Sequence, residues 1–162
     1  MIADMIETIA PVRSDKCPPV IPDSDKTRTE ICYNRAHEID GPDLPQIVEA
    51  RLEKELNSII KNGFAVMYII AQKLVWKSVE DGYLVGSRGS VGSSFVATMA
   101  GITEVNPLSP HYYCSKCHYV DFDSEEVKAY AGKAGIDMPD KVCPVCGEKL
   151  HKDGFDIPFE TF

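Results

Sequence analysis

The sequence predicts a chain that mixes α-helices with short β-strands, an α/β (α+β) fold, and that carries a small insertion built around four cysteines. Apolar residues recur at helical spacing in the first half of the chain, and two CxxC pairs lie in the second half. Between them come short β-branched and glycine-rich stretches. A length of 162 residues with 44% hydrophobic side chains suits one compact domain with a real core.

The net charge of −8 argues against a protein that coats nucleic acid through a broad basic face. It leaves open a site that handles phosphate with a few local groups. The longest apolar run, residues 64–71, is too short to cross a bilayer, and the N-terminus lacks the cationic and apolar regions of a signal peptide. We therefore expect a cytoplasmic protein with no membrane partner.

The first 45 positions predict an irregular arm followed by a helix and a turn. Four prolines interrupt residues 1–23 and prevent a long helix there. Ser24 is a suitable cap for a helix through about Ile39, which the turn at residues 40–42 ends. Asp43 is the expected N-cap of the next helix, with Pro45 in its first turn.

This second helix is predicted to be amphipathic and to stop at Asn62-Gly63. Its apolar positions at helical spacing are Val48, Leu52, Leu56, Ile59 and Ile60. Its charged positions fall mainly on the other side, and we expect them to form a solvated face: Glu49, Arg51, Glu53, Lys54 and Glu55.

Residues 64–70 are β-branched and aromatic, which allows a short buried strand that turns into a helix. That helix is expected to end at Asp81-Gly82, and residues 83–86 are expected to form a short strand. A further helix can begin at Phe95 and run to Ala100.

The stretch GSRGSVGSS, residues 86–94, lies between that expected strand and helix, a context that favours a phosphate-binding loop over a linker. Glycine lets backbone N–H groups approach an anion, serine hydroxyls add donors, and Arg88 adds a positive fork suited to phosphate oxygens. A helix starting near Gly92 would add its positive end. The stretch matches neither a Walker A loop nor a GxGxxG fingerprint, and a tight structural turn remains the alternative.

Four cysteines form two CxxC pairs, a spacing typical of a closed structural zinc site: Cys114, Cys117, Cys143 and Cys146. Gly147 permits the left-handed turn that follows such a pair. An iron–sulfur cluster, a thioredoxin-like redox pair and two disulfides are the weaker alternatives. We expect Cys17 and Cys32 to be ordinary thiols. Three histidines lie near the cysteines, and we expect them to be on the surface: His111, His118 and His151. A ligand role for His118 remains an alternative.

Residues 82–114, GYLVGSRGSVGSSFVATMAGITEVNPLSPHYYC, closely resemble the palm of the PolC-type alpha subunit of bacterial DNA polymerase III. The stretches RLEKELNSIIKNGFAVMYIIAQKLV, KVCPVCGEKLHKDGFDIPFETF and IADMIETIAPVR are similar to the same family in the same order, so the resemblance covers essentially the whole chain.

The resemblance implies part of a polymerase-beta-like nucleotidyltransferase palm. The expected organisation is an arm (1–23), a palm portion (24–110), a zinc-binding insertion (111–150), and a segment leading toward a catalytic strand (151–162). By similarity, Gly89 and Ser90 hold the triphosphate of the incoming deoxynucleotide, Arg88 stands beside it, and Ser93 and Ser94 are second choices. The four cysteines match the family's zinc insertion.

The resemblance also implies that the acidic residues holding two Mg²⁺ ions come after residue 162, so we expect no catalytic residue here. Asp153 and Asp156 match only the approach to that motif, and we expect them to be turn and surface residues. We expect an inactive polymerase fragment whose complete enzyme binds dNTP and primer–template DNA, and contacts the sliding clamp and replisome subunits through other regions. The alternative is a free-standing zinc-binding or nucleotide-binding module.

Overall fold

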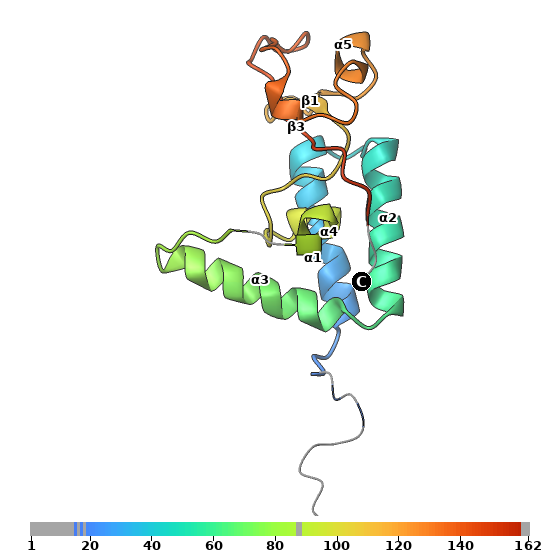
Figure 1. The fold of residues 1–162 in the computed structure, drawn as a ribbon, viewed down its shortest axis with the longest axis vertical. Helices are drawn as coiled ribbons and strands as arrows, with labels where there is room; N and C mark the ends of the chain where they lie inside the picture. Colours follow the sequence, from blue (N-terminus) through green and yellow to red (C-terminus); the bar gives the residue numbers. More distant parts are fainter. Residues whose placement is uncertain (1–14, 16, 18, 87–88, 160–162) are drawn as a thin grey trace, which may run out of the picture.

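The computed structural model describes residues 15, 17, 19–86 and 89–159, which form two packed units (Figure 1). Helices α1–α4 make a helical body, residues 24–108. Above the ends of α1 and α2 lies a cysteine module, residues 111–153, which carries the small sheet. The mixture of helices with a small sheet confirms the coarse fold class.

Helices α1 (Ser24–Asp40) and α2 (Gln46–Lys61) form an antiparallel pair joined next to the cysteine module. Gly41 ends α1 in the left-handed region (φ 85°), as its turn residues predicted. Helix α2 begins later than expected, after Pro45, whose ψ of 140° is not helical. The ring of Pro45 disfavours helical angles at the residue before it, so Asp43 cannot serve as the N-cap.

Helix α3 (Ala65–Glu80) contacts the lower part of α1 and extends away from α2 (Figure 1). The strand predicted at residues 64–70 is therefore wrong, whereas the predicted helix end at Asp81-Gly82 is confirmed. The strand predicted at residues 83–86 is also wrong. These residues are irregular, Leu84 is fully exposed, and no strand in the described part of the chain lies beside them to pair with.

The glycine-rich stretch continues into a 3₁₀ turn, η2 (Gly89–Ser93), and a short helix, α4 (Phe95–Met99). Helix α4 lies in the middle of the helical body, where it contacts α1 and α2. Phe95, Val96 and Ala97 are buried there. They join a core that α1, α2 and α3 also supply, including Cys32, Leu52, Leu56 and Tyr68.

The cysteine module consists of a three-stranded antiparallel sheet, a short helix and a 3₁₀ turn. Its elements are β1 (His111–Tyr113), β2 (Val120–Asp121), α5 (Glu125–Lys128), η3 (Gly135–Asp137) and β3 (His151–Asp153). The strand order is β2-β1-β3, with Tyr113 opposite both Val120 and His151. The sheet thus includes residues beyond 150, which were expected to belong to the following segment.

After β3 the chain returns to the helical body through residues 155–157. Their N–H groups donate to the carbonyls of Asn106, Leu108 and Pro107 at 2.9–3.0 Å. Gly154 permits this return, because its φ is 98° and an added Cβ would lie 2.3 Å from the Ser109 carbonyl oxygen. No described helix combines the length and apolar character needed to span a membrane.

Candidate functional site

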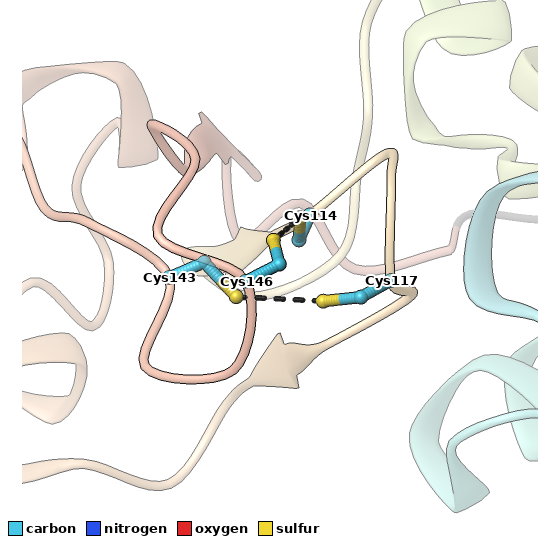
Figure 2. Close-up of side chains that lie close together, drawn as sticks. All are labelled: Cys114, Cys117, Cys143 and Cys146. Carbon is cyan, nitrogen blue, oxygen red and sulfur yellow. Dashed lines mark hydrogen bonds between the residues drawn. The ribbon is translucent and has the colours of Figure 1, made fainter.

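The four CxxC cysteines converge at one point of the cysteine module (Figure 2). Their Sγ atoms all lie within 4.8 Å of one another, and the Cys114–Cys146 and Cys117–Cys143 pairs are each 3.4 Å apart. Cys17 and Cys32 lie outside this group, the first exposed and the second buried in the helical core. Among the described residues, these four cysteines are the one group of three or more histidine, cysteine, aspartate or glutamate side chains close enough to share a metal ion.

Each CxxC pair adopts the same local turn. The N–H of Cys114 donates to the Tyr119 carbonyl at 2.8 Å, and the N–H of Cys143 donates to the Glu148 carbonyl at 2.7 Å. This bond folds each pair back so that both of its thiols face the opposite pair. The equivalent turns explain why a spacing pattern visible in the sequence becomes a four-sulfur site.

The residue after each CxxC pair is left-handed. Gly147 has φ 76°, as its sequence position predicted, but the equivalent residue of the first pair is His118, with φ 60°. The His118 ring reaches the helical body, where Nδ1 lies 2.8 Å from the Ile39 carbonyl oxygen at the end of α1. This histidine therefore connects the cysteine module to the helical body and is directed away from the sulfurs.

The four thiols influence one another, so that the pKa is lowered at the first cysteine of each pair and raised at the second, Cys117 and Cys146. The N–H groups of Cys117 and Lys116 donate to Cys114 and lower its pKa to about 6. Burial raises the pKa of Cys143, but the N–H groups of Cys146 and Val145 outweigh burial and lower it. Thiolate is the form that binds metals.

The donor set fits Zn²⁺. A tetrahedral zinc with bonds of about 2.3 Å to sulfur places its sulfurs about 3.8 Å apart, between the shortest and longest separations here. Four sulfur ligands complete the tetrahedral shell, which suits a structural site.

The histidines of the module are not all on the surface. His111 was expected there, but it is buried in β1, where its ring stacks on Phe122 at 4.4 Å and Nδ1 lies 2.7 Å from the Ser109 carbonyl oxygen. Burial lowers its pKa. His151 is exposed as expected and stacks on Tyr113.

The glycine-rich loop has an exposed tip and a buried base. Gly89 begins η2 with φ 69° and has open space where a Cβ would lie, and Ser90 beside it is exposed. Ser93 is only 5% exposed, and its hydroxyl donates to the Ser90 carbonyl at 2.8 Å. Arg88 lies outside the described residues. An irregular segment precedes the loop, so the predicted strand–loop–helix context is not found.

The base of the loop is held by Glu55, which was predicted to be solvated and is fully buried (0% exposed). Its Oε2 accepts hydrogen bonds from the Ser94 hydroxyl and the Val96 N–H, both at 3.0 Å. The start of α4 is thus already capped by a carboxylate, and its positive end faces Glu55. Periodicity contained this signal, because Glu55 follows Leu52 by three residues and precedes Ile59 by four.

The two aspartates near the end of the chain differ from each other. Asp156 is an exposed residue with φ 52° that accepts a hydrogen bond from the Gly132 N–H, which agrees with the expected surface role. Asp153 lies in β3, not in a turn, and accepts a hydrogen bond from the Asn106 side chain at 3.0 Å.

Comparison with known proteins identifies the family. The family model described as the bacterial DNA polymerase III alpha NTPase domain matches residues 26–162. This chain belongs to that family. This match and the relatives named PolC-type, at 54–60% identity over 99% of the chain, confirm the resemblance.

Relatives named "DNA polymerase III PolC-type" align with this family member over 161 residues, or 99% of its length. The protein of Latilactobacillus sakei is 60% identical, that of Caldanaerobacter subterraneus 57% and that of Bacillus subtilis 54%. The chain spans about a tenth (11%) of the length of these relatives.

Proposed function

We propose that this chain is the part of a bacterial replicative DNA polymerase that holds the triphosphate of the incoming deoxynucleotide, within a polymerase-beta-like palm. Membership of the polymerase III alpha family supports the enzyme class. The loop at residues 86–94 is the proposed triphosphate site. The proposal assigns nucleotide binding to this chain and leaves nucleotidyl transfer to carboxylates outside it, so that the chain alone is inactive.

The observation that carries the proposal is the contrast between the loop's tip and its base. Gly89 and Ser90 are exposed, and the N–H groups at the start of a 3₁₀ turn have no partner within the turn. Ser93 and Ser94 are buried and hydrogen-bonded beneath them. A fixed base with an open tip is preorganised to bind an anion at little cost in ordering.

The proposed roles follow from this contrast. Gly89 and Ser90 contact the phosphates through N–H and hydroxyl donors, and Arg88 supplies the positive charge. Ser93 contributes by shaping the turn through its hydrogen bond to Ser90. Because Glu55 caps α4, the phosphates interact with η2 and Arg88 and not with the end of that helix.

Zinc has a structural role in this proposal, held by Cys114, Cys117, Cys143 and Cys146. When bound, it crosslinks the two CxxC turns and so fixes the sheet of the cysteine module. In the complete polymerase, Mg²⁺ would supply charge neutralisation at the reacting phosphate. Primer–template DNA, the sliding clamp and replisome subunits are proposed partners of the complete enzyme.

Substitutions in the complete polymerase test the loop. Arg88→Ala and Ser90→Ala should each raise the KM for nucleotide by about tenfold, the effect of losing one charge-assisted or well-placed hydrogen bond. The dissociation constant for primer–template should change less than twofold. Arg35→Ala is the matched control, because Arg35 is an exposed arginine paired with Glu38 on α1. Unchanged nucleotide kinetics in both loop variants would refute the proposal.

A further inference from the structure

Two charged residues of α2, Arg51 and Glu55, form hydrogen bonds to the buried base of the loop at residues 93–96. Arg51 and Glu55 form an ion pair one helical turn apart, with Glu55 fully buried and Arg51 18% exposed. A buried carboxylate is tolerated only when its oxygens are paired, and here Arg51, Ser94 and Val96 supply the donors. The pair therefore has a defined geometry that neither residue would keep alone.

Arg51 extends this geometry to a second segment of the chain. Its Nη2 donates to the Ser93 carbonyl at 2.8 Å and to the Ile157 carbonyl at 3.0 Å, while Nε donates to Glu55. Ser93 is the last residue of η2, and Ile157 lies in the segment that returns from the cysteine module. One guanidinium thus joins the loop to a segment 64 positions further along the chain (157 − 93).

Arg51 therefore adds a side-chain link between two segments that backbone hydrogen bonds hold separately. The N–H groups of residues 155–157 donate to the carbonyls of residues 106–108, and the Asp156 carboxylate accepts from the Gly132 N–H. Ser94 also bonds to Tyr68 and to its own helix. The planar fork of arginine reaches three acceptors at once, which a lysine ammonium on a flexible stem does not do with the same geometry.

We propose that Arg51 and Glu55 are positioning residues for nucleotide binding: together they set where the loop at residues 89–94 lies relative to residues 155–159. This inference rests on the proposed function of the loop. The pair does not contact the triphosphate. It acts through Ser93, Ser94 and Val96, whose positions determine where the exposed donors of Gly89 and Ser90 lie.

The test uses Arg51→Lys in the complete polymerase. Lysine retains the charge beside Glu55 but gives up the simultaneous bonds to Ser93 and Ile157. We expect the nucleotide KM to rise about fivefold or more, as for a lost hydrogen bond, while primer–template affinity changes less than twofold and the melting temperature stays within a few degrees. Arg35→Lys, in the exposed pair with Glu38, is the matched control and should change none of these.

Arg51→Met provides the second variant. It removes the cation and leaves the Glu55 carboxylate buried without its ion pair, so it should lower the melting temperature as well as raise KM. The double variant Arg51→Met, Glu55→Gln removes the uncompensated charge. It should recover most of the melting temperature but not the nucleotide KM.

The outcomes separate this inference from the proposed function. If Arg88→Ala and Ser90→Ala raise the nucleotide KM but Arg51→Lys does not, the positioning role is refuted and the loop assignment stands. The positioning role is equally refuted if KM recovers together with the melting temperature in the double variant, since the pair would then be merely structural. If neither loop variant changes KM, the proposed function itself fails.

Discussion

Removing the metal should unfold the cysteine module and leave the helical body folded. The module's buried cluster contains only four side chains besides two ligand cysteines: Tyr112, Val127, Met138 and Leu150. At about 1.5–3 kcal/mol each, their burial contributes roughly 6–12 kcal/mol. Structural zinc contributes about 10–16 kcal/mol at pH 7. Zinc bound at this site would therefore supply roughly 45–75% of the sum of these two contributions.

The helical body should survive because its buried core residues all lie outside the cysteine module, although Phe122 of the module packs against them. Thirteen buried residues form that core, and none of the four metal ligands belongs to it. Hydrogen exchange of the zinc-loaded 162-residue chain, with and without a strong chelator, measures both units at once. The amides of Tyr112 and Tyr113 in β1 should lose protection on chelation, while those of Leu52 and Leu56 in α2 should keep it.

Two variants sharpen this experiment. Cys143→Ser should reproduce the effect of the chelator and leave less than one equivalent of zinc on the purified chain. Cys17→Ser, an exposed cysteine outside the metal group, is the matched control and should retain full zinc and full protection. Full protection of β1 in metal-free protein would refute this dependence on the metal, as would purified protein with no stoichiometric zinc.

Four further substitutions test the fold. Gly154→Ala should lower the free energy of unfolding by about 3 kcal/mol, because the added Cβ would lie 2.3 Å from a carbonyl oxygen. Gly132 is also left-handed but has open space around it, so Gly132→Ala should lower the free energy of unfolding by only about 1 kcal/mol. Equal losses of stability in thermal melts would contradict the close approach at Gly154. Burial raises the pKa of Asp40 from 3.8 to about 6, so the native state binds this proton more tightly than the unfolded chain and loses stability as pH rises from 4 to 6. Asp40→Asn should therefore stabilise the chain at pH 7.5 by on the order of 1 kcal/mol, discounted for solvent screening, with no gain below pH 4 in a pH series of melts. The three guanidinium nitrogens of Arg28 are buried without a nitrogen or oxygen partner among the described residues, and the Tyr68 ring face and the Cys32 thiol lie nearby. Arg28→Met should therefore raise the free energy of unfolding by about 1 kcal/mol or more. A lower melting temperature for this variant would contradict that expectation.

The convergence of the four cysteines could be predicted from the sequence because the geometry of each CxxC turn is local. Each CxxC turn brings its two thiols together within a few residues, and Gly147 marks the left-handed position that follows. His118 takes the same position in the first pair with no glycine to signal it. The contact that accompanies the left-handed conformation of His118 is with the Ile39 carbonyl, 79 residues away in the sequence. A local sequence pattern cannot reveal a contact at that separation.

The strand predicted at residues 64–70 failed because short apolar runs are equally compatible with a strand and a helix. The run belongs to a helix that is apolar on several sides, with Met67 and Leu74 exposed and Tyr68 and Ile69 buried. Because apolar residues such as Leu74 occupy exposed positions, the sequence of α3 lacks the regular polar face by which an amphipathic helix is recognised.

Glu55 was missed for a different reason. A charged residue on a helix is usually solvated, and the partners that allow its burial, Ser94 and Val96, lie 39 and 41 residues away in the sequence. Its place within the apolar stripe of α2 was the available signal. A charge on an apolar stripe indicates a buried contact whose partner is distant in sequence.

We propose above that the tip of the glycine-rich loop, Gly89 and Ser90, holds the nucleotide triphosphate. A structure of the complete polymerase with primer–template and an unreactive incoming nucleotide tests it most directly. We expect phosphate oxygens within hydrogen-bond distance, about 2.7–3.2 Å, of the Gly89 or Ser90 donors and of Arg88, with Glu55 still capping α4. A triphosphate bound elsewhere, with this loop making no contact to it, would contradict the claim.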